Sequence, residues 1–213
     1  MDPSSLDAAY LANLDAYKNL GREVKFGLDQ ALAQAGIKPH AVTFRVKDLG
    51  SLRTKADDKG WTDPLNEATD IVGARVVVPF QSDVPRAHEV VRSTFKIIKE
   101  ENKSSPAEVS SFGYAGLHLD AQIRESHAGP RYNALKAFRF EVQVRTIVED
   151  AWAAVSHILA YKGRSSIPEE LQRDFYALSG LFYIADQHFE LFHKDAVKAG
   201  QRATAQVAAA EAE

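Results

Sequence analysis

The sequence contains no cysteine, and this absence removes several classes of chemistry. Without thiols the chain forms no disulfide, no zinc–thiolate centre and no cysteine nucleophile. It also lacks an apolar run of about 18 residues, the length that a helix needs to cross a bilayer. The first residues do not have the pattern of a secretory signal peptide. We therefore expect a globular cytoplasmic protein that has no contact with membranes.

The chain also has no large excess of positive or negative charge. The formal net charge is -3 and the isoelectric point is near 6.2. Such a chain does not attract nucleic acid through its overall charge, so any polyanion site must be a local group of basic side chains. A length of 213 residues with 45% hydrophobic content is enough for one good core.

The most informative segment is 138–145, in which apolar and polar residues alternate strictly. One face would carry Phe138, Phe140, Val142 and Val144, and the other Arg139, Glu141, Gln143 and Arg145. Period-two patterning is typical of a strand buried on one side. An antiparallel sheet with one solvated face carries polar residues there by default. A carboxylate between two guanidinium groups also suits a metal ion with phosphates, so the strand alone leaves both interpretations open.

Basic residues gather earlier in the chain. Arg45 and Lys47 lie on one side of a short predicted strand, and Ser51 and Lys55 follow one helical turn apart. Guanidinium and ammonium groups in this arrangement suit a triphosphate. An ordinary charged strand end is the competing interpretation.

Asp70 directly precedes the apolar segment 71–80. This segment is predicted to be a central strand covered on both faces. Asp70 is unfavourable there unless it is paired, so a cation is a reasonable partner. Gly73 lets a ligand or another backbone come close, and Arg75 follows. A carboxylate that caps a turn would explain Asp70 equally well.

Segment 113–118 joins two glycines, a tyrosine and a histidine where another strand is predicted to begin. A ring such as that of Tyr114, held on a glycine-rich turn, is a stacking platform for a base. Tyr114 and His118 could instead fill the core. The helix after residue 146 adds His157 and Lys162, which are weak signals when taken alone.

In their order and spacing these motifs resemble the synthetase domain of the RelA/SpoT family. The resemblance covers about residues 40 to 165 closely, and the flanking helices look like those of its single-domain members, the small alarmone synthetases. The most diagnostic pieces are Glu-x-Gln-x-Arg-Thr, from Glu141, and Gly-Tyr-x-x-Leu-His, from Gly113.

The resemblance implies an α+β fold with a mixed, mostly antiparallel β-sheet of about five strands flanked by α-helices, a nucleotidyltransferase-like synthetase fold. We expect a single synthetase domain over 1–195, with N-terminal helices at 5–36, a catalytic core at 40–165 and C-terminal helices at 168–195. An Ala-rich tail would occupy 196–213. No His-Asp pair precedes Arg45, so we expect synthesis without the hydrolase activity of the family's long members.

The implied activity is Mg²⁺-dependent transfer of pyrophosphate from ATP to the ribose 3′-hydroxyl of GDP or GTP, which makes the alarmone (p)ppGpp of the stringent response. On matching positions, Asp70 and Glu141 are the implied catalytic residues and Mg²⁺ ligands, with Glu141 also a candidate base. The implied ATP-binding residues are Arg45, Lys47, Ser51, Lys55 and Arg75. The implied acceptor-binding residues are Tyr114, which stacks on the base, with His118, Gln143 and Arg145, and the supporting residues are His157 and Lys162.

Two departures from the family pattern leave the acceptor open. Ser110-Ser111-Phe112 stands where the family often has Lys-x-Asn, and Gly116 where it often has Ser. The alternative is a toxin of a toxin–antitoxin pair that pyrophosphorylates the 3′ end of tRNA or makes adenosine alarmones. The expected partners are ATP with GDP or GTP, tRNA in the toxin interpretation, an antitoxin, and further copies of the chain in a homo-oligomer. A catalytically inactive binding module is disfavoured, because both Asp70 and Glu141 are present.

Overall fold

The computed structural model describes residues 3–102, 117–160 and 167–211. In chain order the elements are α1 (Pro3–Gln34), β1 (Ala41–Val46), α2 (Leu49–Lys59), α3 (Pro64–Glu67), β2 (Val72–Val78), α4 (Asp83–Thr94), β3 (Lys96–Asn102), β4 (Leu117–Gln122), β5 (Phe140–Thr146), α5 (Ile147–Ala160) and α6 (Glu169–Glu211).

The five strands form one sheet in the order β1-β2-β5-β4-β3. Strands β2 and β5 are parallel, and the other three neighbouring pairs are antiparallel. A parallel pair needs a crossover connection, and here α4, β3 and β4 separate the two strands along the chain. The expected α+β fold, with a mixed and mostly antiparallel sheet flanked by helices, is confirmed.

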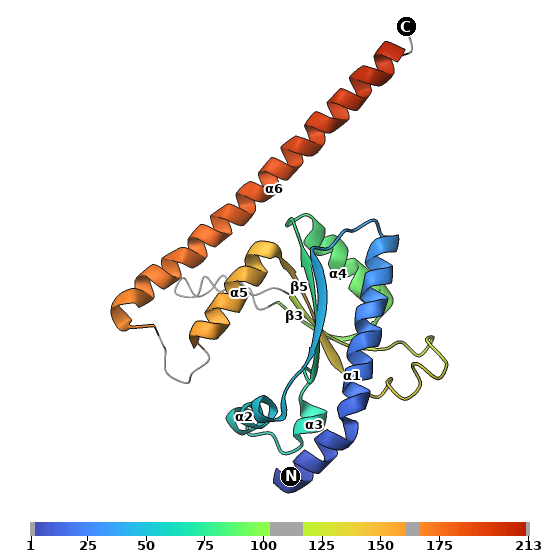
Figure 1. Cartoon of the computed structure of the whole chain (residues 1–213), viewed down its shortest axis with the longest axis vertical. Helices are drawn as coiled ribbons and strands as arrows, with labels where there is room; N and C mark the ends of the chain where they lie inside the picture. The colour runs from blue at the N-terminus through green and yellow to red at the C-terminus, as the bar shows by residue number, and fades with distance from the viewer. Residues whose placement is uncertain (1–2, 103–116, 161–166, 212–213) are drawn as a thin grey trace.

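Helices α1 and α4 lie together on one side of the sheet (Figure 1). Helix α1 is one continuous helix whose buried stripe repeats every four residues, at Leu20, Val24, Leu28 and Leu32. Such a stripe is the apolar face of an amphipathic helix. Helix α1 packs against β1, β2 and α4, and its stripe belongs to the same hydrophobic core as Phe140, Val142 and Val144 of β5, which are fully buried.

The prediction for segment 71–80 was right for only half of the strand. Val76, Val77 and Val78 are buried, but Gly73 and Arg75 are only partly buried. The N-terminal half of β2 therefore has one open face. The reason is local, because the alternate positions in this half carry a glycine and an arginine instead of apolar side chains.

Helix α2 is fixed at both ends by its own residues. The Asp48 carboxylate accepts hydrogen bonds from the backbone N–H of Ser51 at 2.8 Å and from its hydroxyl at 2.7 Å. Gly60 ends the helix in the left-handed conformation, with φ of 65°. This helix carries Lys55.

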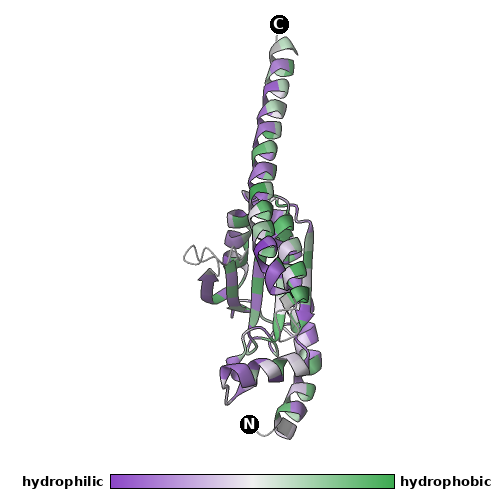
Figure 2. Ribbon diagram, turned by 90° about the vertical axis from the view of Figure 1, so that its left-hand side faces the viewer, coloured by the Kyte–Doolittle hydropathy of each residue, from purple (hydrophilic) through white to green (hydrophobic). Residues whose placement is uncertain are grey.

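Helix α6 runs without interruption from Glu169 to Glu211, so no break separates 168–195 from the Ala-rich segment. It extends away from the sheet, and hydrophilic and hydrophobic residues mix along it (Figures 1 and 2). Its middle contacts the domain through Asp186, which accepts hydrogen bonds from Gln81 and Thr146, both at 3.0 Å. None of the helices in the described ranges is both long and apolar enough to cross a membrane.

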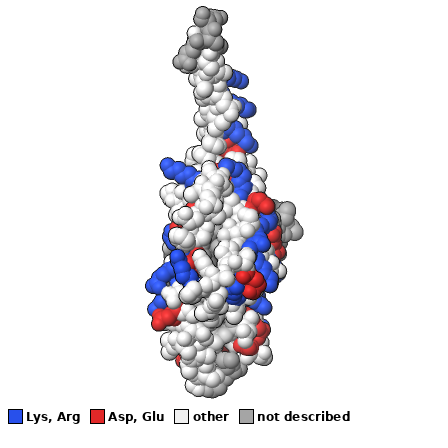
Figure 3. All heavy atoms as spheres, turned by 90° about the vertical axis from the view of Figure 1, so that its right-hand side faces the viewer, with Lys and Arg blue, Asp and Glu red and all other residues white. Residues whose placement is uncertain are grey.

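The surface on the α1 side carries charges of both signs. Acidic and basic side chains are interspersed over this face (Figure 3). This distribution agrees with the small net charge of the chain and shows no extended basic surface on that side.

Candidate active site

The polar residues of the central strands share the face of the sheet opposite α1 and α4. In the strand register, Glu141 lies between Gly73 of β2 and Asp120 of β4. Gln143 lies between Arg75 and His118 in the same way. The alternation read from segment 138–145 therefore holds from Phe140 onward, and it places these side chains side by side.

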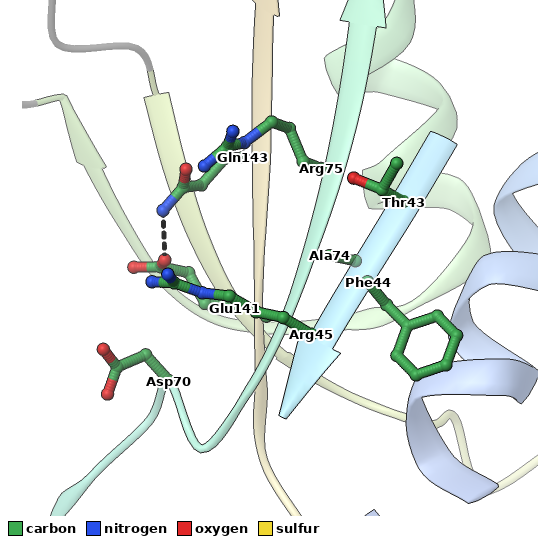
Figure 4. Close-up of a pocket in the computed structure, with 9 residues that line it drawn as sticks. Thr43, Phe44, Arg45, Asp70, Ala74, Arg75, Glu141 and Gln143 are labelled. Carbon is green, nitrogen blue, oxygen red and sulfur yellow. Dashed lines mark hydrogen bonds between the residues drawn. The ribbon is translucent and has the colours of Figure 1, made fainter. Parts of the chain in front are cut away.

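A hollow of about 180 Å³ opens on this face. It is lined by Thr43, Phe44, Arg45, Asp70, Gly73, Ala74, Arg75, Glu141 and Gln143, and we call it the polar hollow. Arg45 and Arg75 extend toward Glu141 and Gln143, whereas the ring of Phe44 points away (Figure 4). A Cβ at Gly73 would meet the Arg45 side chain at 3.9 Å, so the missing side chain leaves room in the floor of the hollow.

Both carboxylate oxygens of Glu141 have a hydrogen-bond partner. The Gln143 Nε2 donates to Oε1 at 2.5 Å, and Nδ1 of His118 lies 2.8 Å from Oε2. His118 is only 8% exposed, so packing restricts its ring. These contacts hold the Glu141 carboxylate in one orientation. The predicted acceptor residues His118 and Gln143 thus both contact the predicted catalytic residue.

Asp70 lies in the loop before β2, where two lysines converge on one of its oxygens. Lys47 Nζ and Lys55 Nζ each lie 2.8 Å from Oδ2. Burial acts to raise the pKa of Asp70, but hydrogen bonds and positive charge from the two lysines outweigh it and lower the pKa below its usual value. The carboxylate is therefore ionised at neutral pH. Its Oδ1 is buried and has no hydrogen-bond partner among the described residues.

Two guanidinium groups lie near one another on the same face. Arg75 pairs with Asp150 of α5 at 2.7 Å. Arg145 is 8% exposed, and both burial and the positive charge of Arg75 lower its pKa. Its Nε has no hydrogen-bond partner within the described ranges. The carboxylates of Asp150, Glu149 and Glu141 oppose this lowering of the Arg145 pKa. Two guanidinium groups so close together also suit an anion such as phosphate.

The donor atoms on this face fit Mg²⁺. The carboxylates of Asp70 and Glu141 line the same hollow, and Asp70 Oδ1 is a buried oxygen without a partner. In the part of the chain that the structure describes, no group of three or more His, Asp or Glu side chains could hold a metal ion. Mg²⁺ typically uses one or two carboxylates and takes its other ligands from water and nucleotide phosphates. Two carboxylates are therefore sufficient.

The other predicted site residues that the structure describes do not line the polar hollow themselves. Ser51 lies in the first turn of α2 and donates to the N-cap residue Asp48, and it does not line the polar hollow. Lys55 also lies over the ring of Trp61, 5.5 Å from its centroid. His157 is exposed on α5 and does not line the hollow. Tyr114 and Lys162 lie outside the described residues, as do Gly116 and segment 110–112.

Sequence reasoning missed Asp120 and Asp150. Asp120 could have been found, because alternation along 117–123 puts it on the same face as His118. Burial is the main cause that raises the pKa of Asp120, the charges of Glu141 and Asp70 raise it further, and a hydrogen bond from Thr69 opposes them. Asp150 gave no comparable signal, because its partner Arg75 is distant in sequence.

Comparison with known proteins agrees with this fold. The structure is similar to that of a GTP pyrophosphokinase family protein from Streptococcus pneumoniae, with a TM-score of 0.75, 24% identity, and coverage of 90% of this chain and 96% of that one. It is also similar to small alarmone synthetase 1 from Bacillus subtilis, with a TM-score of 0.74, 22% identity, and coverage of 89% and 98%. The fold is thus that of the small alarmone synthetases.

Residues 44–166 match the model of the region found in RelA / SpoT proteins, and the chain belongs to this family. Among curated proteins, it is 30% identical to GTP pyrophosphokinase YjbM of Bacillus subtilis (strain 168) over 136 residues, which are 62% of this chain and 61% of YjbM. It is 26% identical to GTP pyrophosphokinase YwaC of the same organism over 149 residues, 67% of this chain and 68% of YwaC. The match therefore spans about three fifths of YjbM. The family resemblance read from the motifs is confirmed.

Proposed function

We propose that this chain is a Mg²⁺-dependent ATP:nucleotide 3′-pyrophosphokinase that makes (p)ppGpp from ATP and GDP or GTP. The observation that carries the proposal is the polar hollow, in which an oriented Glu141 and an ionised Asp70 lie among Arg45 and Arg75. Membership of the RelA/SpoT family and the similarity to GTP pyrophosphokinases support it.

In this reaction the ribose 3′-oxygen of the acceptor attacks the β-phosphorus of ATP. The bond between that phosphorus and the oxygen bridging to the α-phosphate breaks, AMP leaves, and the hydroxyl proton must go to a base. Reactions of this kind depend mostly on positioning and on neutralising charge in the transition state. The chain supplies basic side chains for that purpose around the polar hollow.

The donor half is formed by β1, β2 and α2. Arg45 and Arg75 line the hollow and would bind the ATP phosphates. Lys47 and Lys55 pair with Asp70, which lines the same hollow. Asp70 and Glu141 would hold Mg²⁺, which when bound neutralises charge on the β- and γ-phosphates. Because Lys47 and Lys55 share one oxygen of Asp70, the other oxygen stays available for the metal.

Glu141 is the proposed base for the 3′-hydroxyl. A base must be held within hydrogen-bonding reach of the proton that it accepts. The contacts of Gln143 and His118 with its two oxygens restrict the carboxylate before substrate arrives. Preorganisation of this kind avoids reorienting the base during the reaction.

The acceptor half would be formed by β4 and β5. Gln143 and Arg145 lie on this side, and Tyr114 remains a predicted stacking residue for the acceptor base. Small alarmone synthetase 1 of Bacillus subtilis has been solved bound to its product pppGpp and bound to AMPCPP. We propose the same classes of ligand here, with cytoplasmic ATP and guanine nucleotides as the substrates. An antitoxin partner and a homo-oligomer stay predictions from the sequence.

An acceptor screen tests the proposal. Purified protein with Mg²⁺ and γ-labelled ATP is offered GDP, GTP, adenine nucleotides and bulk tRNA in separate reactions. We expect label on GDP or GTP, with one AMP released for each transfer. Label on tRNA or on adenine nucleotides alone would favour the toxin alternative, and no AMP with any acceptor would contradict the proposal.

A further inference from the structure

A second hollow, of about 540 Å³, lies at the end of the sheet where β4 stops and β5 begins. Helices α1 and α3 also line it, and α3 lies beside the N-terminal half of α1 (Figure 1). Small-molecule sites in proteins have volumes of about 300–1,000 Å³, so this hollow is large enough for such a ligand. We call it the amide hollow, because the side-chain amides of Asn13, Asn66 and Gln122 line it.

Each of the three amides is oriented by a hydrogen bond to a group that can only accept. Asn13 Nδ2 donates to the backbone carbonyl four residues earlier at 2.9 Å, and Asn66 Nδ2 donates to the Asp63 carboxylate at 2.7 Å. Gln122 Nε2 donates to the Ala137 carbonyl at 3.4 Å. One N–H of each amide is used in this way, so its second N–H and its carbonyl oxygen can pair with a ligand.

The amide hollow also has an aromatic wall and a single charge. The ring of Tyr17, which is 4% exposed, meets the ring of Phe138 edge to face, with the centroids 5.2 Å apart. Phe138 is partly buried, and Arg139 beside it is exposed. Arg139 is the one charged side chain among the described residues that line this hollow, and no carboxylate is among them. The hollow therefore suits a planar ligand with one anionic group.

The amides distinguish between the purine bases. An Asn or Gln amide pairs with adenine, because it accepts from the amino group on C6 and donates to a ring nitrogen. Guanine is most often bound through its oxygen and N7 by arginine or lysine. The one guanidinium here is matched by the phosphate of a mononucleotide, which a planar fork of N–H groups binds in a bidentate manner. The side chains that line the hollow thus suit adenine better than guanine.

We propose that the amide hollow is a second ligand site, separate from the polar hollow, that takes an adenine mononucleotide. The base pairs with the side-chain amides and stacks against the aromatic wall, and the phosphate binds Arg139.

The two hollows are lined by neighbouring residues of the same two segments. In the loop before β2, Ala68 and Ile71 line the amide hollow, and Asp70 between them lines the polar hollow. Where β5 begins, Arg139 lines the amide hollow, and Glu141 lines the polar hollow. A nucleotide in the amide hollow therefore contacts both segments that carry the proposed catalytic carboxylates. An influence of AMP on turnover rests on the proposed function, whereas the binding of AMP does not.

Substitutions on both hollows separate the possible sites. Arg139→Ala removes the partner of the phosphate, and Arg173→Ala, at an exposed position on α6, is its control. Asn13→Leu removes one amide and keeps the size of the side chain. Asn19→Leu is its control, because Asn19 is exposed on the same helix and does not line the amide hollow. Arg75→Ala reports on binding in the polar hollow.

The experiment is equilibrium dialysis of the full chain against radiolabelled AMP, in buffer with EDTA so that no divalent cation assists binding elsewhere. We expect saturable binding that weakens by about tenfold or more in Arg139→Ala and by about three- to tenfold in Asn13→Leu. Arg173→Ala, Asn19→Leu and Arg75→Ala should bind AMP like the unsubstituted protein. Unlabelled GMP and adenosine should each compete about tenfold less well than unlabelled AMP. Circular dichroism checks that every variant is folded.

Three outcomes would overturn the proposal. The first is no saturable binding of AMP by the unsubstituted protein. The second is binding that is lost in Arg75→Ala and kept in folded Arg139→Ala, because AMP would then occupy the polar hollow. The third is competition by GMP that equals that of AMP, which would contradict recognition of adenine. If the protein makes no AMP from ATP but the dialysis results are as expected, the proposed function fails and the second ligand site stands.

Discussion

The imidazole Nδ1 of His118 lies 2.8 Å from Oε2 of Glu141, and the two residues are on neighbouring strands. They are diagonal partners, because His118 is opposite Gln143 and Glu141 is opposite Asp120 in the register. The contact therefore depends on the alignment of β4 with β5. It gives the ring a role in orienting the proposed base.

His118→Ala should lower kcat by about tenfold or more and leave the KM for ATP nearly unchanged, because the substitution removes the contact with Oε2 of Glu141 and leaves the donor half intact. Steady-state AMP release measures both constants. His188→Ala, at an exposed position on α6, is the control. A His118→Ala protein with normal kcat would show that the contact does not matter for the reaction.

Gly21→Ala should destabilise the protein by about 1–3 kcal/mol, because a Cβ at this position would overlap the ring of Phe44. Gly27→Ala is the matched control on the same helix, because its Cβ would lie 3.4 Å from Phe95, an ordinary contact. Chemical denaturation of both variants tests this. The double variant Gly21→Ala/Phe44→Leu should recover stability, because leucine is smaller than the phenylalanine ring. Equal stability of the two alanine variants would be the contrary result.

His88 should make the protein sensitive to acid. Burial, followed by the charge of Arg92, lowers its pKa from 6.5 to about 4. The unfolded chain then binds a proton between these values that the folded chain does not. Stability from this group is fully present above pH 6.5 and is lost as the pH falls toward 4, by roughly 3 kcal/mol in total.

Unfolding free energies of the unsubstituted protein and His88→Leu, measured from pH 7 to pH 4, test this prediction. The variant should lose less stability over that range, because leucine cannot bind the proton. Parallel curves for the two proteins would show that His88 is not responsible.

Asp186 should have the opposite dependence on pH. Burial raises its pKa, the charge of Glu190 raises it further, and hydrogen bonds from Gln81 and Thr146 oppose them. The folded chain therefore holds this proton more strongly than the unfolded chain. The resulting stability is present at low pH and is lost as the pH rises through the folded-state pKa.

Asp186→Asn keeps an oxygen that accepts from Gln81 and Thr146 but removes the buried charge, so it should raise the Tm at pH 8 and change it little near pH 4. Asp195→Asn, on an exposed part of α6, is the control. A lower Tm for Asp186→Asn at pH 8 would contradict the assignment.

Much of the catalytic face was predictable, because its residues follow the period of the strand. Glu141 and Gln143 alternate with buried valines, and this pattern is fixed locally by the pleat. The contacts between strands were not predictable. Which residue binds Glu141 depends on the β4–β5 register, and the Arg75–Asp150 pair depends on where α5 packs. The Ala-rich tail continues α6, because alanine is the strongest helix former.

The most direct test of the account is the rate of AMP formation from ATP with GDP in Glu141→Gln. The amide keeps the size of the side chain but cannot act as a base or as an anionic metal ligand, so we expect the rate to fall by about 100-fold or more. The circular dichroism spectrum and the Tm should stay those of the unsubstituted protein. Undiminished AMP formation in the folded variant would contradict the assignment of Glu141 and, with it, the proposed site.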